Sequence, residues 1–183
     1  MRKLKTDELN RISIEDFKKQ EKTKIVVILD NIRSMHNIGS VFRTCDAFRI
    51  EKLLLCGITA TPPHREIQKT ALDATESVVW EYYENTKDAI KQLQNDKFKI
   101  LGIEQTDNSI SLEDFLPEPN TKYAVIFGNE INGVDENVLR ECDFCIEIPQ
   151  FGTKHSFNIS VSAGIVLWDM FAKIKKNKSK ILI

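Results

Sequence analysis

The stretch that decides the fold is residues 25–29, which read Ile25-Val26-Val27-Ile28-Leu29. A continuous apolar run, rich in β-branched side chains, is typical of a strand buried on both faces of a sheet. Residues 37–48 follow as an amphipathic helix with Asn37 as its N-cap, because apolar side chains recur at helical spacing. A buried strand followed directly by a helix indicates a parallel sheet covered by helices.

The same alternation continues along the chain. Further strands are expected at 53–56, 78–83, 98–103, 123–127 and 144–148, and further helices at 66–74, 87–93, 135–142 and from 158 to about 174. We therefore expect an α/β fold with a mostly parallel sheet flanked by helices. Trp80 and Trp168 are expected to pack in the core.

Length and charge bound the organisation of the chain. A chain of 183 residues suits one domain, and a formal net charge of −1 gives no overall attraction to nucleic acid. The charge is uneven, however, which predicts a basic extension over residues 1–22, a domain over 23–175 and a lysine-rich tail over 176–183. The basic ends could follow a phosphate backbone or serve only solubility, and residues 1–22 could form a short helix or be disordered.

Cysteine usage indicates a reduced cytoplasmic protein. The four cysteines have no disulfide-framework spacing, and neither a signal peptide nor a transmembrane run is apparent, so no membrane association is expected. Cys142 and Cys145 have the gap of a redox or metal pair, but no second pair completes a zinc site. We interpret that spacing as chance and expect no metal.

Three polar segments interrupted by glycine follow apolar runs. They are Asn37-Ile38-Gly39-Ser40-Val41-Phe42-Arg43, Phe127-Gly128-Asn129-Glu130-Ile131-Asn132-Gly133 and Ile148-Pro149-Gln150-Phe151-Gly152-Thr153-Lys154-His155-Ser156-Phe157-Asn158. Open α/β sheets bind small ligands where such segments leave the strands. The three segments together predict one shared site.

These segments resemble the three motifs of the SpoU/TrmH family of RNA ribose 2′-O-methyltransferases, which belong to the SPOUT superfamily. The resemblance covers about residues 25–171. It implies a parallel sheet of five or six strands with a deep C-terminal trefoil knot, and S-adenosylmethionine as cofactor. It also implies an obligate homodimer in which the knotted region and last helix form the interface and each site draws on both chains. The last helix supports this independently, since it is apolar nearly all round.

The resemblance also places individual residues. Cofactor contacts, largely through backbone groups, are implied at Ile103, Glu104, Gly128, Ile148 and Phe157. The family usually has Leu where Phe157 stands and often Met where Gln150 stands, and many relatives carry an N-terminal RNA-binding domain where this chain has about twenty residues.

The catalytic residues implied are Arg43, Asn37, Glu130, Ser156 and Asn158. An arginine at the position of Arg43 has been proposed in the family as the base for the 2′-hydroxyl proton, but a guanidinium with a pKa above about 12 suits this role badly. We expect Arg43 to position a phosphate and stabilise developing oxyanion charge. Ser156 and Asn158 would orient Arg43 or the substrate, Asn37 would brace its loop, and Glu130 would fix the motif loops.

The function implied is RNA ribose 2′-O-methylation, with tRNA favoured over rRNA and a D-loop guanosine as the leading target. Three alternatives stay open: an rRNA ribose methyltransferase, a non-catalytic knotted RNA-binding module, and an enzyme that methylates a base.

Overall fold

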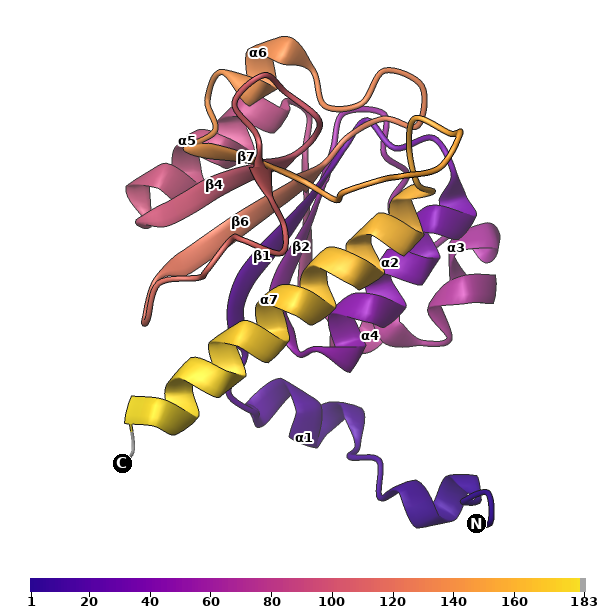
Figure 1. The fold of residues 1–183 in the computed structure, drawn as a ribbon. Helices are drawn as coiled ribbons and strands as arrows, with labels where there is room; N and C mark the ends of the chain where they lie inside the picture. Colours follow the sequence, from indigo (N-terminus) through magenta and orange to yellow (C-terminus); the bar gives the residue numbers. More distant parts are fainter. Residues whose placement is uncertain (182–183) are drawn as a thin grey trace.

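The computed structural model describes residues 1–181 and has a seven-stranded sheet between two helical layers (Figure 1). The strands are β1 (Thr23–Asp30), β2 (Ile50–Cys56), β3 (Trp80–Tyr83), β4 (Phe98–Ile103), β5 (Ile110–Ser111), β6 (Lys122–Phe127) and β7 (Phe144–Glu147). The helices are α1 (Ile14–Lys19), α2 (Met35–Ala47), α3 (Arg65–Ala71), α4 (Ala74–Ser77), α5 (Thr86–Asn95), α6 (Glu136–Leu139) and α7 (Ile159–Ile181), and a 3-10 turn spans Thr6–Leu9.

All strand pairs are parallel, in the order β3-β2-β1-β6-β4-β7-β5. The predicted α/β class is therefore confirmed. The sheet has seven strands where five or six were expected. The additional strand is β5, which lies beside β7 and has only two residues, too few to leave a sequence pattern. The trefoil knot concerns how the chain between β6 and α7 is threaded, and it stays a prediction.

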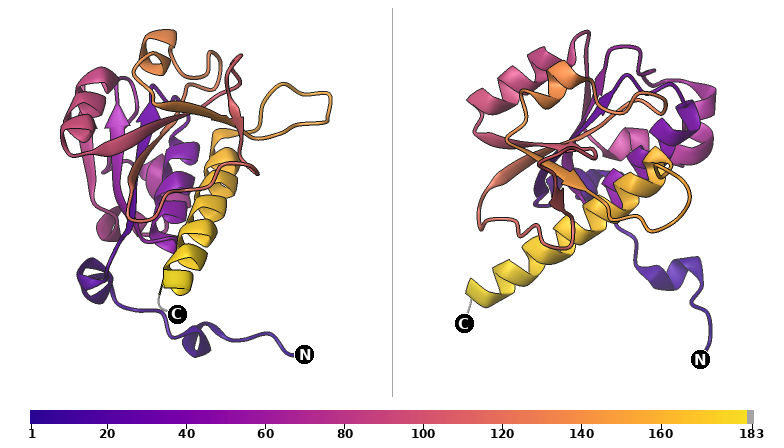
Figure 2. Two further views of the ribbon diagram at one scale, coloured as in Figure 1. Left: turned by 60° about the vertical axis from the view of Figure 1, so that its left-hand side comes forward. Right: turned by 45° about the horizontal axis from the view of Figure 1, so that its top comes forward.

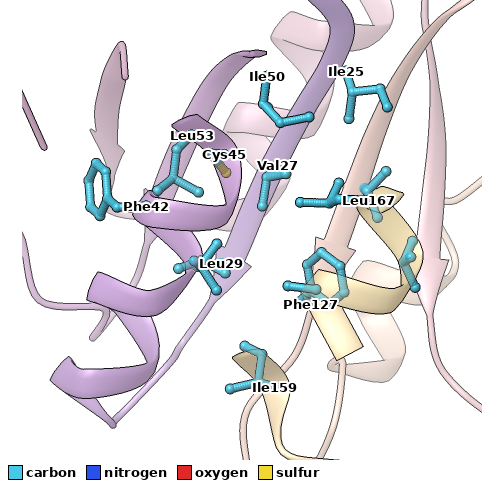
Figure 3. Packing of buried hydrophobic residues seen from close by; sticks show 14 of the residues in the cluster. Ile25, Val27, Leu29, Phe42, Cys45, Ile50, Leu53, Phe127, Ile159 and Leu167 are labelled. Atoms are coloured by element: carbon cyan, nitrogen blue, oxygen red, sulfur yellow. The ribbon is translucent and has the colours of Figure 1, made fainter. Parts of the chain in front are cut away.

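Alternation along β1 explains why both faces of the sheet are covered. Ile25, Val27 and Leu29 belong to a core cluster shared with α2, α3 and α7, as Figure 3 shows for the packing around Phe42, Phe127 and Leu167. Val26 and Ile28 point to the opposite cluster, which α5 and α6 cover. Successive side chains of a strand face opposite sides, so an uninterrupted apolar run requires a helical layer on each side.

Several predicted boundaries shift. The N-cap of α2 is Ser34, whose side chain accepts a hydrogen bond from the Asn37 N–H at 3.3 Å, so the prediction of Asn37 as N-cap was wrong. The helix expected over 66–74 is split into α3 and α4 by left-handed backbone at Leu72 (φ 48°) and Asp73 (φ 65°). The strand expected from residue 78 begins at Trp80, and the helix expected over 135–142 is shortened to α6.

The N-terminal segment and the last turns of α7 lie at the end of the sheet opposite the loops after β6 and β7 (Figure 1). Residues 1–22 contain the 3-10 turn and α1, and Phe17 anchors α1 through a side chain only 6% exposed. The last helix continues past the expected residue 174 to Ile181, so the first part of the predicted tail is helical, and residues 182–183 lie outside the described residues. Within residues 1–181, no helix combines the length and apolar character needed to cross a membrane.

One face of α7 is exposed, contrary to the prediction that Trp168 packs in the core. Ala163, Leu167 and Met170 are fully buried against the sheet layer, whereas Trp168 is 58% exposed on the other side of the helix. The Trp168 ring lies against Phe48 and Phe171, with centroids 5.7 and 6.3 Å away. This aromatic cluster leaves an apolar surface over α7 and the end of α2.

Candidate functional site

The carboxyl ends of β1, β6, β4 and β7 meet at one edge of the sheet. Leu29 pairs with Phe127, and Ile103 pairs with Ile146, so the loops that follow these strands are neighbours. Because the strands are parallel, polar residues that follow them in sequence converge at this edge. The loop after β7 projects from the body of the molecule (Figure 2, left).

The loop after β6 closes on itself through its backbone. Asn129 N–H donates to Gly133 O at 2.8 Å and Gly133 N–H donates to Asn129 O at 2.9 Å. Gly133 has left-handed backbone (φ 68°), and a Cβ on Gly128 would lie 2.2 Å from the carbonyl carbon of Gly133. Asn129 Nδ2 also donates to Asn31 O at 2.7 Å, which ties this loop to the one after β1. Both glycines are required for the closed turn.

Glu104 connects the loops after β4 and β6. Its Oε2 accepts a hydrogen bond from Val134 N–H at 3.0 Å, and its Oε1 accepts from Gln105 N–H at 3.0 Å. A carboxylate that accepts backbone N–H groups in this way fixes the geometry of both loops. The side chain therefore shapes the site as a brace.

Glu130 joins the second motif to the first. Its carboxylate accepts hydrogen bonds from the backbone N–H groups of Arg33 and Ser34, at 3.1 Å each, and from Asn37 Nδ2 at 3.1 Å. Partial burial opposes ionisation of Glu130, but these donors outweigh it and hold the pKa of the carboxyl below its usual value. Glu130 thus ties the loop after β6 to the start of α2, through Arg33, Ser34 and Asn37.

Asn37 and Asn158 extend the connection to the third motif. Asn37 Oδ1 accepts a hydrogen bond from Asn158 Nδ2 at 3.1 Å. Asn158 Oδ1 in turn accepts from Ser160 N–H at 2.9 Å and from Ser160 Oγ at 2.6 Å, so it caps α7. One chain of polar contacts, from Glu130 through Asn37 to Asn158, therefore holds the three motifs together.

A cavity of about 510 Å³ opens between these loops. Its wall mixes apolar side chains with amides, carboxylates and exposed backbone. Eight of the ten predicted site residues line it: Ile103, Glu104, Gly128, Glu130, Ile148, Ser156, Phe157 and Asn158. Asn37 contacts two of them through the hydrogen bonds above.

Arg43 lies apart from this cavity. Its side chain is exposed and lines a separate depression of about 520 Å³ that it shares with Gly164 of α7. Among the side chains that the structure describes, which exclude those of residues 6, 7 and 178–183, the Arg43 guanidinium has no hydrogen-bond or ion-pair partner. At 100° per residue, Arg43 is rotated about 120° around α2 from Asn37, so the two side chains cannot serve the same cavity of one chain.

Residues 24–168 match the model of the SpoU rRNA Methylase family. The chain belongs to this family. A 23S rRNA (guanosine-2′-O-)-methyltransferase RlmB of Neisseria meningitidis serogroup B is 30% identical over 159 residues, which are 86% of this chain and 62% of that protein. The chain spans less than two thirds of the curated SpoU relatives it matches, with 64% for one from Staphylococcus aureus.

Two solved structures of SpoU proteins share the fold. The A. aeolicus TrmH/SpoU tRNA modifying enzyme has a TM-score of 0.79 at 21% identity, over 90% of this chain and 84% of that one. The SpoU methyltransferase AviRb from Streptomyces viridochromogenes, in complex with the cofactor AdoMet, has a TM-score of 0.77 at 19% identity, over 88% of this chain and 64% of that one. These two similarities show that this chain shares the fold of both solved structures.

Some residues that build the site were not among those predicted. Ser34 and Ser160 hold Asn37 and Asn158 in place, and Gln105, Ile131 and Ser162 line the cavity. Serine is a preferred N-cap residue, and its place just before the amphipathic run was the available signal for Ser34. Gly152 differs from the other motif glycines, because no atom lies within 4 Å of a Cβ built on it.

The cysteine pair lies outside the cavity. Burial, with a smaller contribution from Cys145, raises the pKa of the Cys142 thiol to about 12, so it remains protonated near neutral pH. In the part of the chain that the structure describes, no three His, Cys, Asp or Glu side chains gather as metal ligands would.

Replacing Glu130 with glutamine should lower the free energy of unfolding at pH 7 by about 1 kcal/mol, allowing for solvent screening of an exposed group. The folded-state pKa of Glu130 is depressed, so its contribution is present above the unfolded value of about 4.3 and is lost as pH falls through the folded value. Urea unfolding of both proteins at pH 7 and at pH 3 should therefore show a difference that shrinks in acid. Glu136→Gln, at a carboxylate 3.9 Å from Arg140, is the control and should show no such pattern. A difference between wild type and Glu130→Gln that is independent of pH would contradict the assignment.

Proposed function

We propose that this protein is an S-adenosylmethionine-dependent RNA ribose 2′-O-methyltransferase that acts on tRNA, with a D-loop guanosine as the first target to test. The observation that carries the proposal is the cavity at the carboxyl edge of the sheet, lined by residues of the second and third motifs and braced by the first. Membership of the SpoU family supports it. The name of the A. aeolicus protein favours tRNA, and that of the Neisseria relative keeps rRNA as the alternative.

The cavity fits the cofactor. Its volume of about 510 Å³ lies within the range of about 300–1,000 Å³ typical of small-molecule sites. Gly128 and Gly133 leave backbone groups accessible, and Ile103, Ile148 and Phe157 offer apolar surface to an adenine ring. When bound, S-adenosylmethionine supplies a reactive methyl group on a sulfonium sulfur. The residues of this chain then have to align the ribose oxygen and assist loss of its proton.

Arg43 supplies the charge for that task. Its planar guanidinium suits a bidentate contact with a phosphate beside the target ribose, and it stabilises the oxyanion that develops on the 2′-oxygen. A guanidinium suits the role of a base badly, so water or a phosphate oxygen receives the proton. Arg43 has no partner among the described side chains, which leaves the guanidinium available for substrate.

Arg43 reaches a cofactor in a homodimer. The depression that holds Arg43 also holds Gly164, next to an apolar face of α7 formed by the exposed Val161 and Trp168 and the half-buried Phe171. A second copy packed on this face would bring its own cavity to Arg43. Each active site then combines the cavity of one protomer with Arg43 of its partner.

Replacing Gly164 with arginine should convert the dimer into a folded monomer. No atom lies within 4 Å of a Cβ built on Gly164, so one chain has room for a side chain, whereas a closely packed second chain has none. Arginine is also a better helix former than glycine by about 0.8 kcal/mol, so the fold should not suffer. Light scattering at micromolar concentration measures the change, and Asn95→Arg, at an exposed position of α5 in the opposite helical layer, is the control. A dimer that survives Gly164→Arg would place the interface elsewhere.

The activity is tested by incubating the protein with methyl-labelled cofactor and total RNA from cells that lack its gene. We expect label in the tRNA fraction, released by nucleoside digestion as 2′-O-methylguanosine. Label in rRNA would support the alternative substrate, and a base-methylated product would assign a different chemistry. Absence of label from every RNA would favour a non-catalytic binding module.

A further inference from the structure

Two depressions continue from Arg43 toward the ends of the chain. The first, of about 440 Å³, lies between the N-terminal segment and α2 and α4, and Arg11, Arg43 and Arg49 line it. The second, of about 210 Å³, lies at the amino end of the sheet, where Arg49 is joined by Lys22, Lys24 and Lys175. Arg49 lines both, so the two depressions adjoin. They lead from Arg43 to the end of the molecule where α1 and the last turns of α7 lie (Figure 1).

This surface is positive in a chain that is slightly negative. Six basic side chains line the two depressions, against the four acidic residues Asp46, Asp73, Glu21 and Glu118. The formal net charge of the whole chain is −1. One of the acids, Asp46, already accepts a hydrogen bond from Ser77 Oγ at 2.5 Å. The positive charge is thus gathered along one route, as a polyanion requires.

Three of the six cations on this route are less neutralised than the paired cations of the opposite helical layer. Within the described part of the chain, Arg11, Lys24 and Arg43 have no ion-pair partner. On the α5 and α6 side, by contrast, cations have carboxylates close by: Lys87 to Glu141 at 4.0 Å, Lys99 to Asp143 at 3.5 Å, and Arg140 to Glu136 at 3.9 Å.

Lys22 and Arg49 are neighbours of like charge. Partial burial and then the positive charge of Arg49 lower the pKa of the Lys22 ammonium. Arg49 also has left-handed backbone (φ 50°), a conformation that glycine adopts at lower cost. An anion placed between the two cations would relieve their repulsion.

We propose that the phosphate backbone of the substrate RNA follows this surface, here called the basic path, which consists of Arg11, Lys22, Lys24, Arg43, Arg49 and Lys175. The proposal rests on the proposed function, because it takes Arg43 as the point where the RNA enters the active site. The N-terminal segment and the end of α7 then hold nucleotides flanking the target. The basic path would supply phosphate contacts from within residues 11–175 of this chain.

The test compares two triple variants that remove the same charge. Arg11→Gln, Lys24→Gln and Arg49→Gln remove three of the six positive charges of the basic path and leave Arg43 in place. Lys87→Gln, Lys99→Gln and Arg140→Gln are the matched control on the opposite layer. Binding of a fluorescently labelled tRNA transcript is measured over a range of KCl concentrations. Each lost phosphate contact should reduce the slope of log K against log salt by about 0.7 to 0.9, so the first triple should lose about 2 to 3.

We expect at least a tenfold loss of tRNA affinity at about 0.1 M KCl for the path variant, and less than a twofold change for the control. Cofactor affinity should be unchanged in both. Equal salt slopes for the two triples would overturn the proposal. If wild type methylates tRNA and the path variant has the wild-type KM for tRNA, the basic-path proposal is contradicted but the proposed function is not. If wild type methylates no RNA, the proposed function itself is contradicted.

Arg49→Gly separates binding from folding. Glycine removes the strain of the left-handed backbone, so the variant should melt at or above the wild-type temperature. It should nevertheless bind the tRNA transcript about threefold or more weakly, because one phosphate contact is lost. Wild-type tRNA affinity in this stable variant would contradict a contact at Arg49.

Discussion

Replacing Arg43 with alanine should lower the rate of methyl transfer by at least 10²- to 10³-fold, the usual effect of removing one stabiliser of developing negative charge. Cofactor affinity should stay within about twofold of wild type, because the contacts assigned to Arg43 are with a phosphate and the 2′-oxygen of the RNA and none is with the cofactor. Single-turnover transfer to tRNA and calorimetric titration of the cofactor measure the two quantities separately.

Two further variants sharpen this result. Arg43→Lys keeps the charge but loses the planar fork, so its rate should fall between those of alanine and wild type. Arg140→Ala removes an arginine whose side chain is 74% exposed at the C-cap of α6, and it should leave transfer unchanged. Turnover of Arg43→Ala within about tenfold of wild type would contradict the role assigned to the guanidinium.

Replacing Gly128 with alanine should abolish cofactor binding, with a loss of at least a hundredfold. A Cβ at this position would lie 2.2 Å from both Gly133 C and Val134 N, and 2.4 Å from Gly133 O. These are backbone atoms of the closed loop, so they cannot move aside as the end of a flexible side chain could. The loop must open, which displaces the wall of the cavity and costs about 1–3 kcal/mol of stability.

Gly152→Ala is the matched control, since it makes the same chemical change where a Cβ meets no atom within 4 Å. Its cofactor affinity and melting temperature should match those of wild type. Calorimetric titration and thermal unfolding should be run on both variants. Unchanged cofactor affinity in Gly128→Ala would mean that the cofactor binds away from the loop after β6.

The strands and layers could be predicted because their signal is local. β1 and β6 are unbroken apolar runs, and the faces of α2 and α5 repeat at helical spacing. Features that depend on distant partners could not be predicted. Asn37 has a residue type suited to capping, but its amide binds Glu130 and Asn158, which are 93 and 121 residues away, while Ser34 caps the helix.

The convergence of the second and third motifs also follows from sequence, since ends of parallel strands share one edge. The separation of Arg43 from that edge follows from helical geometry, because six residues along α2 turn it about 120° from Asn37. What no sequence pattern contains is where a second chain would sit. Trp168 illustrates this: its apolar surroundings predict burial, yet one chain leaves it 58% exposed.

The central claim is that each active site joins the cavity of one protomer to Arg43 of its partner. It is tested most directly by the transfer rate of a purified heterodimer in which one protomer carries Arg43→Ala and the other Gly128→Ala. If the site is shared, one of its two sites contains neither change, and the heterodimer should have about half the activity of wild type. A wild-type protomer paired with the double variant should then be inactive. An inactive Arg43→Ala/Gly128→Ala heterodimer, together with activity from the wild-type/double-variant pair, would place the whole site within one chain and contradict this account.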